Sequence, residues 1–336
     1  METLPLLSVD NLKTYFFQDE GTVKAVDGAG FDVFPGKTLG IVGESGCGKS
    51  VTTMSILRLI EKPGRIVAGR VVLRLANGKE VDLTSLHPDG EEIRSIRGAE
   101  IGLVFQEPMT SFSPVHTIGD QLTEAIRLHS KANKREAHAL GIEALRNVGI
   151  PNPERRIDQY SFQMSGGLRQ RAMIAVALSC NPRLLIADEP TTALDVTTQA
   201  QILDLMRDLQ NKKGMAIMLI THNLGVIAEM ADDVVVMYLG RVVEKGPVDA
   251  IFHNPKHPYT RALLDSIPNI NAQTRVKLPT ITGSIPHPYA RPRGCPFYPR
   301  CPRFMPGTCD KEEPVLTSVG DRQEASCFLY QEGRDR

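Results

Sequence analysis

One eight-residue stretch constrains the fold of this chain more than any other. Residues 43–50 match the pattern of a phosphate-binding loop in full: a glycine, four residues, then Gly-Lys-Ser. A short apolar run at 38–42 precedes the stretch, and residues 51–60 follow it with apolar side chains at helical spacing. A strand, such a loop and a helix in this order form the context in which the loop cradles phosphate groups. The chain is therefore expected to bind a nucleoside triphosphate.

The residue types of the loop fit this chemistry. Glycines let backbone N–H groups converge on an anion, and the helix N-terminus adds a partial positive charge. The Lys49 side chain can reach the terminal phosphates, and the Ser50 hydroxyl can coordinate Mg²⁺. The residues expected to contact the nucleotide here are Gly43, Ser45, Gly46, Cys47, Gly48, Lys49, Ser50 and Val51.

Length and charge exclude several classes of protein. A chain of 336 residues has room for two or three domains or subdomains. Lys plus Arg number 39 and Asp plus Glu number 39, so no net charge draws the protein to nucleic acid or anionic lipid. No apolar run reaches the roughly 18 residues that span a bilayer, and the N-terminus does not resemble a secretory signal. A cytoplasmic protein is expected, with any membrane role acting through partners.

Strand and helix patterns alternate along the chain, which implies an α/β fold with a largely parallel sheet. Residues 118–148 are instead predicted to be helical and are interrupted by a polar connection at 130–135. The expected inward positions of this insertion are Leu122, Ile126, Leu140, Ile142, Leu145 and Val148. Strands are expected within 6–34, joined by a turn at 18–21, and at 38–42, 66–75, 101–105, 183–188, 216–221, 234–238 and 241–244; helices at 51–60, 198–210 and 224–230.

Two further motifs indicate what kind of NTPase this is. The apolar strand 183–188 ends in two acids, of which Asp188 can hold Mg²⁺ and Glu189 can polarise the attacking water. The turn Ser165-Gly166-Gly167 opens a helix and offers a second phosphate cradle. One chain cannot fold both cradles around one nucleotide if they lie on different lobes, whereas a dimer can.

With these motifs the chain resembles an ATP-binding subunit of an ABC transporter over roughly residues 6–250. Ser165-Gly166-Gly167 matches the family's signature motif, Ala193-Leu194-Asp195 its D-loop, Gln106 its Q-loop glutamine and His222 its switch histidine. The resemblance implies a P-loop domain over 1–255, made of a RecA-like core, an antiparallel β subdomain and a helical subdomain at about 107–180. It also implies a head-to-tail dimer, with each ATP between residues 43–50 of one copy and 165–167 of the other.

The same resemblance assigns roles outside the loop. His222 would contact the γ-phosphate, Gln106 would reach Mg²⁺ and link the site to membrane subunits, and Asp195 would lie near the nucleotide. Lys49, Gln106, Glu189 and His222 then form the expected catalytic set. Phe16 either packs in the core or stacks on the nucleotide base. Departures from the family pattern at Met164, Leu168, Asn223 and Val51 leave the acids and Lys49 intact, so a competent ATPase is expected.

The last part of the chain, residues 256–336, is rich in proline and is predicted to have little regular structure. Its His257-Pro258-Tyr259 sequence and its four cysteines resemble the C-terminal extension of oligopeptide/dipeptide importers, some of which carry a [4Fe–4S] cluster. Four thiolates suit an iron–sulfur cluster or zinc, and the lack of paired Cys-x-x-Cys motifs favours the cluster. The expected ligands are Cys295, Cys301, Cys309 and Cys327.

Together these features predict an ATPase subunit that energises import of oligopeptides, dipeptides or related solutes. Nickel, metallophores or oligosaccharides are alternative cargoes within the same subfamily, and a soluble ABC ATPase or an exporter subunit fits less well. The expected partners are a second ATPase subunit (a paralogue, giving a heterodimer), two transmembrane permease subunits and an extracytoplasmic solute-binding protein, with no nucleic acid. The expected place is the cytoplasmic face of the inner membrane, as a peripheral protein.

Overall fold

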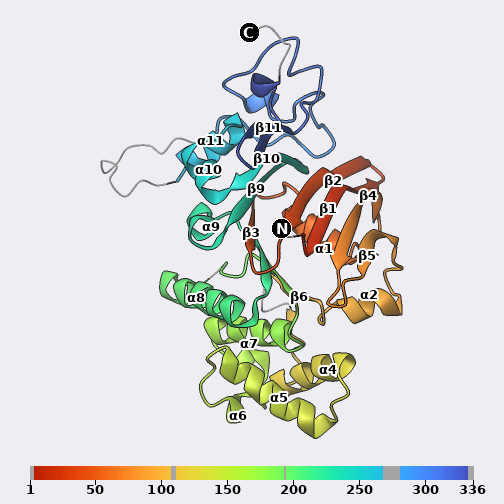
Figure 1. The fold of residues 1–336 in the computed structure, drawn as a ribbon, viewed down its shortest axis with the longest axis vertical. Helices are drawn as coiled ribbons and strands as arrows, with labels where there is room; N and C mark the ends of the chain where they lie inside the picture. Colours follow the sequence, from red (N-terminus) through yellow and green to blue (C-terminus); the bar gives the residue numbers. More distant parts are fainter. Residues whose placement is uncertain (1–3, 107–110, 193, 268–280, 332–336) are drawn as a thin grey trace. The chain divides into compact units, whose positions relative to one another are not determined.

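The computed structural model describes residues 4–106, 111–192, 194–267 and 281–331 (Figure 1). These residues divide into two compact units. The first holds residues up to 7, 33–38 and 73–220, and the second holds 8–32, 39–72 and 221 onward. Each unit is described below by itself, and the predicted domain boundary near residue 255 stays a prediction.

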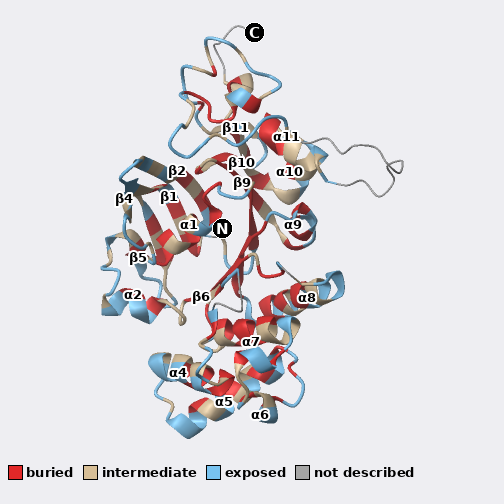
Figure 2. Cartoon of the chain, turned by 180° about the vertical axis from the view of Figure 1, so that it is seen from behind, coloured by how far each residue is buried: buried red, intermediate tan, exposed pale blue. Residues whose placement is uncertain are grey.

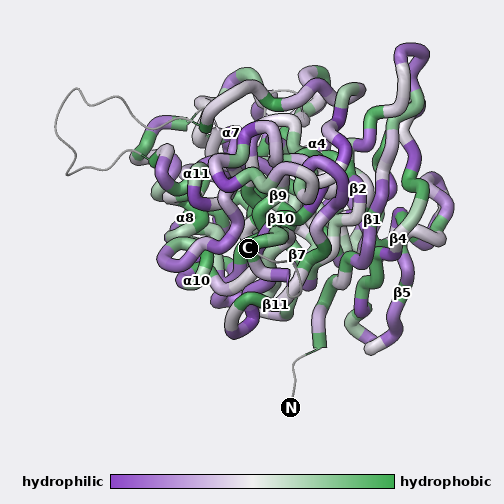
Figure 3. Tube along the Cα trace, turned by 90° about the horizontal axis from the view of Figure 1, so that it is seen from above, coloured by the Kyte–Doolittle hydropathy of each residue, from purple (hydrophilic) through white to green (hydrophobic). Residues whose placement is uncertain are grey.

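A buried sheet forms the centre of the second unit. Strands β3 (Thr38–Val42) and β9 (Asp233–Tyr238) pair in parallel, with Leu39 opposite Asp233 and Val42 opposite Val236. Strand β10 (Arg241–Pro247) turns back and pairs antiparallel with β9. Strand β3 and most of β9 are buried (Figure 2), and hydrophobic residues concentrate along β9 (Figure 3). The strands that the apolar runs predicted at 38–42 and 234–238 are therefore confirmed.

Most of the described C-terminal segment has no regular structure, as predicted, but two short strands that were not predicted extend this sheet. Strands β11 (Thr317–Gly320) and β12 (Gln323–Ala325) form an antiparallel pair, and β12 pairs with β10, placing Ala325 opposite Glu244. Helices α10 (Val248–His253) and α11 (Pro258–Asp265) follow β10. Short strands among prolines and glycines carry little sequence signal, because their stability comes from pairing with a strand far away in sequence.

A second sheet in this unit has the order β2-β1-β4. It contains β1 (Leu7–Gln18), β2 (Gly21–Val33) and β4 (Gly64–Arg74), with the predicted turn between the first two. Helix α1 (Lys49–Ile56) begins directly at the lysine of the phosphate loop and ends earlier than the predicted 60. Helix α9 (Leu224–Met230) matches its predicted range.

The first unit contains three parallel strands. Strand β7 (Leu184–Asp188) lies between β6 (Ile101–Val104) and β8 (Ala216–Ile220), with Leu184 opposite both Ile101 and Ala216. All five residues of β7 are buried, as expected for a strand covered on both faces. Helix α8 (Val196–Lys213) precedes β8, and the residue that caps its C-terminus, Gly214, is in the left-handed conformation. Two smaller elements, β5 (Glu80–Asp82) and α2 (Glu91–Ile96), were not predicted.

The predicted helical insertion forms a layer of α4 (Ile118–His129), α5 (Lys134–Asn147), α6 (Pro153–Arg156) and α7 (Gly166–Leu178) (Figure 1). Capping boxes at Thr117 and Asn133 fix the starts of α4 and α5, which explains the polar break between them. One inward position was wrong, because Leu140 is exposed and Ile142 only half-buried. The buried face of α5 instead follows Ala137, Gly141 and Leu145, whose small first two residues let the helix approach its neighbours.

Candidate nucleotide site

The phosphate loop connects the end of β3 to the start of α1 within the second unit. Helix α1 begins after Gly48, and no side chain caps it. Its first N–H groups are therefore open to an anion, which the helix dipole also favours. Ser45, Gly46 and Ser50 are exposed, whereas Cys47 and Lys49 are buried. Three of the residues expected to contact the nucleotide are therefore exposed, and Cys47 and Lys49 are not.

The Lys49 side chain is folded back onto its own loop. Its Nζ donates hydrogen bonds to the backbone oxygens of Gly43 at 2.8 Å and Glu44 at 3.2 Å, and it lies 3.8 Å from the Cys47 Sγ. These contacts place the ammonium group within the curve of the loop. A triphosphate bound there would meet a positive charge that is already held in position.

Two glycines of the loop are required by close backbone packing. A Cβ at Gly43 would lie 2.2 Å from the Met237 carbonyl oxygen, and one at Gly48 would lie 2.3 Å from the Ala25 carbonyl oxygen. Gly48 also has a φ of +103°, which side-chain-bearing residues rarely adopt. The turn between β9 and β10 adds to this wall, since the N–H of Gly240 donates to the Cys47 carbonyl oxygen at 2.8 Å.

The second residue of the loop, Glu44, contacts the C-terminal segment. Its backbone N–H donates to the Tyr259 hydroxyl at 2.9 Å. Its carboxylate accepts two hydrogen bonds from Arg300, at 2.8 Å and 3.0 Å. The sequence analysis did not predict this contact between the phosphate loop and the C-terminal segment. The one available signal was Arg300, a charged residue between a proline and a cysteine.

The predicted catalytic acids lie at the end of β7 in the first unit. Asp188 is buried, and Glu189 follows with a φ of +48°, a conformation costly for this residue type. The Oε2 of Glu189 accepts hydrogen bonds from the Gln106 Nε2 at 3.1 Å and from the Thr192 hydroxyl at 2.9 Å. The structure therefore brings together two of the four expected catalytic residues, far apart in sequence.

The second predicted cradle belongs to the same unit. Ser165 is the N-cap of α7 and accepts from the Leu168 N–H at 3.4 Å. Asp195 caps α8 through the N–H of Thr198 at 2.9 Å and its hydroxyl at 2.7 Å, and these bonds lower the pKa of the Asp195 carboxyl. A Cβ at Gly167 would lie 2.8 Å from the Thr198 Cγ2, so the two motifs are neighbours. Ala193, like Glu107 and Pro108 after Gln106, lies outside the described residues.

The remaining predicted residues, His222 and Phe16, belong to the second unit with the loop. Thr221 donates its N–H to the Ile41 carbonyl oxygen in β3, which places the exposed His222 just beyond that strand. Asn223 caps α9, a role the usual aspartate could also fill. The Phe16 ring packs so closely on Gly64 that a Cβ there would lie 2.6 Å from its edge. The half-buried ring thus packs against β4; stacking on a base stays a prediction.

Comparison with known proteins is consistent across the length of the chain. The family model described as "ABC transporter" matches residues 26–192. The oligopeptide transport ATP-binding protein AppD of Bacillus subtilis is 49% identical over 97% of this chain and 97% of its own. The dipeptide transport ATP-binding protein DppD of Escherichia coli is 46% identical over 96% of each chain.

This chain is an ATP-binding protein of the ABC transporter family. A second family model, the C-terminal region of oligopeptide/dipeptide transporters, matches residues 243–309 and places it in that subfamily. The bacterial ABC transporter cassette MJ0796, solved as a dimer, has a TM-score of 0.63 and 25% identity over 72% of this chain and 98% of its own. The predicted P-loop ABC fold with a C-terminal extension is confirmed, as is an ATPase coupled to transport. Among the described residues, no helix has both the length and the apolar character needed to cross a bilayer.

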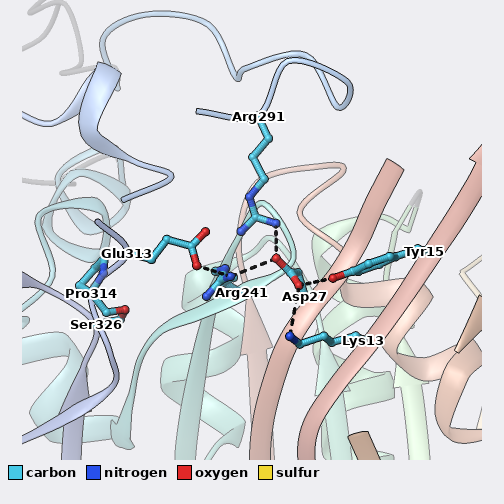
Figure 4. Close-up of polar contacts among 8 residues, drawn as sticks. All are labelled: Lys13, Tyr15, Asp27, Arg241, Arg291, Glu313, Pro314 and Ser326. Carbon is cyan, nitrogen blue, oxygen red and sulfur yellow. Dashed lines mark hydrogen bonds and ion pairs between the residues drawn. The ribbon is translucent and has the colours of Figure 1, made fainter. Parts of the chain in front are cut away.

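A buried carboxylate, Asp27, joins the C-terminal segment of this ABC ATPase to β1, β2 and β10 (Figure 4). Asp27 accepts from the Tyr15 hydroxyl at 2.6 Å, from Arg241 at 3.0 Å and from Arg291 at 2.9 Å. Burial alone would raise the pKa of Asp27, but the Tyr15 hydrogen bond and the two arginines hold it below its usual range. Arg241 also pairs with Glu313 at 2.5 Å. The extension is therefore fastened to the ABC domain by a network rather than by a single strand pair.

The four late cysteines are free thiols in the same unit. Burial raises the pKa of Cys295 to about 12, and the other three thiols contribute to this rise. Burial likewise raises the pKa of Cys327 to about 11, with contributions from Cys301 and Cys309. A backbone hydrogen bond from Cys295 to Cys309, at 2.8 Å, joins two of the segments that carry them. The four thiols therefore lie close enough to affect one another's pKa.

Proposed function

We propose that this ATP-binding protein energises the import of oligopeptides or dipeptides. The observation that carries the proposal is the near full-length similarity to AppD and DppD, whose names specify oligopeptide and dipeptide transport. The similarity includes the C-terminal region and not only the nucleotide-binding motifs. We further propose a peripheral location at the cytoplasmic face of the membrane. There it would bind two permease subunits and a paralogous ATPase and be served by an extracytoplasmic binding protein.

The cargo can be tested with the reconstituted complex. The ATPase is co-expressed with its proposed permease, partner ATPase and binding-protein subunits, and the complex is placed in liposomes. We expect ATP hydrolysis to rise when the binding protein is loaded with a di- or oligopeptide. Stimulation by a nickel chelate or an oligosaccharide, with no response to peptides, would instead assign one of the alternative cargoes.

We assign roles in ATP hydrolysis to the predicted residues. Lys49 and the loop amides of residues 43–50 neutralise phosphate charge, and Ser50, Gln106 and Asp188 hold Mg²⁺. Glu189 orients the attacking water, and its hydrogen bond with Gln106 supports a shared role. His222 contacts the γ-phosphate. In a head-to-tail dimer, Ser165–Gly167 and Asp195 of one copy complete the ATP site of the other.

We also propose that the four late cysteines hold a [4Fe–4S] cluster with a structural role. The proximity of the thiols, which their mutual effects on pKa imply, and their all-sulfur chemistry support it. A single tetrahedral ion with ~2.3 Å metal–sulfur bonds needs thiols only ~4 Å apart. No group of three His, Cys, Asp or Glu side chains among the described residues is arranged so that it could hold a metal ion. The preference for a cluster over zinc therefore rests on the sequence, which has four late cysteines and no paired Cys-x-x-Cys motifs.

Metal analysis of anaerobically purified protein tests this assignment. We expect visible absorbance with about four iron atoms and as many acid-labile sulfides per chain. Cys301→Ser should lose most of the iron. Cys180→Ser should keep it, because Cys180 belongs to the first unit, where its thiol lies 3.6 Å from the Ala125 carbonyl oxygen. Stoichiometric zinc, or a protein free of both metals, would contradict the cluster.

A further inference from the structure

Every polar group of Glu44 has a partner, although the residue belongs to a loop that is expected to bind a ligand. Its N–H donates to the Tyr259 hydroxyl, and its carboxylate accepts from both terminal nitrogens of Arg300. Its carbonyl oxygen accepts from the Lys49 Nζ and from the Cys47 N–H at 3.2 Å each. The first turn of the phosphate loop is thus held from both sides, by its own lysine and by the C-terminal extension.

The arginine that holds Glu44 is itself fixed. Arg300 ends a short 3₁₀ turn, Tyr298–Arg300, and its side chain is only 4% exposed. Its Nε donates to the Thr282 carbonyl oxygen at 3.1 Å, and its Nη1 also donates to the Tyr238 hydroxyl at 3.3 Å. A two-pronged arginine–carboxylate pair with a buried guanidinium defines both distance and direction, unlike a flexible surface pair.

The tyrosine that holds Glu44 lies in an aromatic cluster. Tyr259 is fully buried in α11, and its ring centroid lies 4.7 Å from that of Tyr238 in β9 and 5.3 Å from that of Phe297. Phe297 in turn lies 5.3 Å from Tyr238. Strand β9 pairs with β3, the strand that leads into the loop. The aromatic cluster therefore packs the C-terminal extension against the sheet that carries the phosphate loop.

We propose that Arg300 and Tyr259 are positioning residues for the phosphate loop, holding its first turn in the binding conformation before ATP arrives. The proposal rests on the nucleotide site assigned above. A loop ordered in advance does not lose that conformational freedom on binding, so affinity rises. Arg300 also neutralises the Glu44 carboxylate, which would otherwise repel a triphosphate in the same loop. The C-terminal extension thereby contributes to ATP affinity without touching the nucleotide.

The test compares nucleotide affinity in variants of the full-length chain. With a fluorescent ATP analogue, we expect Arg300→Met to bind about tenfold or more weakly, because the carboxylate is left unpaired. In ATP hydrolysis, KM should rise by a similar factor while kcat changes little. A merely structural role would reduce the active fraction, lowering kcat with KM unchanged, and that result or unchanged affinity would overturn the proposal.

A matched control exists on the same extension. Arg322 donates to both carboxylate oxygens of Asp233 at 2.8 Å each, but its side chain is 62% exposed and the pair does not contact the loop. Arg322→Met should leave affinity and KM at the wild-type values. The double variant Glu44→Gln/Arg300→Met should recover most of the affinity lost in Arg300→Met, because the unpaired charge is gone. Additive losses would argue against a direct coupling.

A second variant decides the matter if Arg300→Met does not fold. Tyr259→Phe removes one oxygen and keeps the ring packing; we expect three- to tenfold weaker binding, on the order of one hydrogen bond. Hydrogen exchange at the Glu44 amide, measured without nucleotide, should be faster in this variant. If the wild type fails to bind ATP, the proposed function is wrong, yet this exchange readout still tests the contact. Unchanged exchange together with unchanged affinity would refute it.

Discussion

Replacing Glu189 with glutamine is expected to reduce ATP hydrolysis by about 100-fold or more while ATP binding stays intact. A general base contributes about 10²–10⁴ to a rate, and an amide cannot take up the proton of the attacking water. Glutamine keeps the size and one acceptor oxygen of the side chain. The hydrogen bonds from Gln106 and Thr192 can therefore persist, and the loop in the other unit is unaltered. Single-turnover hydrolysis and analogue binding, measured on the same preparation, test both parts.

The matched control for this substitution is Glu136→Gln. Glu136 closes the capping box of α5 through the Asn133 N–H at 2.9 Å, a role that glutamine also fills. The same chemical change away from the acids should leave hydrolysis unchanged. Turnover of Glu189→Gln within about threefold of the wild type would show that another group activates the water.

Acid is expected to destabilise the protein through His257. This side chain is 1% exposed, and burial lowers its pKa to about 3 from the ordinary 6.5. The unfolded chain therefore binds a proton below about pH 6.5 that the folded chain refuses. The free energy of unfolding should fall by about 1.4 kcal/mol per pH unit from this group, or about 2 kcal/mol by pH 5. Urea unfolding between pH 7 and 5 measures the slope.

Comparison with His257→Asn isolates this contribution. His257 caps α11 by accepting from the Tyr259 N–H at 3.1 Å, and asparagine can cap without titrating in this range. The variant should be less stable at pH 7, because it leaves space beside Phe297, but its slope should be shallower. Ile251→Val, a loss of one buried methyl group in α10, should instead cost about 0.5–1.5 kcal/mol at every pH. Equal slopes for wild type and His257→Asn would contradict the assigned pKa.

The buried carboxylate of Asp27 does not contribute to the change in stability between pH 7 and 5. Its pKa is lowered, so the stability it contributes is fully present above the ordinary value of 3.8 and is lost only as the pH falls further. The acid response of the two groups should therefore separate into an early phase from His257 and a late one from Asp27. Below pH 4 the Tyr15–Asp27 network would weaken as well.

Local chemistry made much of the nucleotide site predictable from sequence. A glycine-rich turn with Gly-Lys-Ser, an apolar strand ending in two acids, and a Ser-Gly-Gly helix start each carry their function within a few residues. The strands β3 and β7 were equally clear, because strands buried on both faces are continuous apolar runs. The exposed Leu140 was misassigned because apolarity alone does not fix helix phase when Ala137 and Gly141 form the buried face.

The sequence by itself determined the family, the phosphate loop and the acids, because those properties depend on neighbouring residues. Only the tertiary structure decided that β12 extends the sheet beside β10, and that Arg300 and Tyr259 grip Glu44 from more than two hundred positions away. Such contacts leave no periodic or motif signal in the sequence, because the carboxylate and the guanidinium are brought together only when the chain folds. The proposed role of the C-terminal extension in positioning the phosphate loop therefore depends on contacts of Glu44 that the spacing of residues in the sequence does not predict.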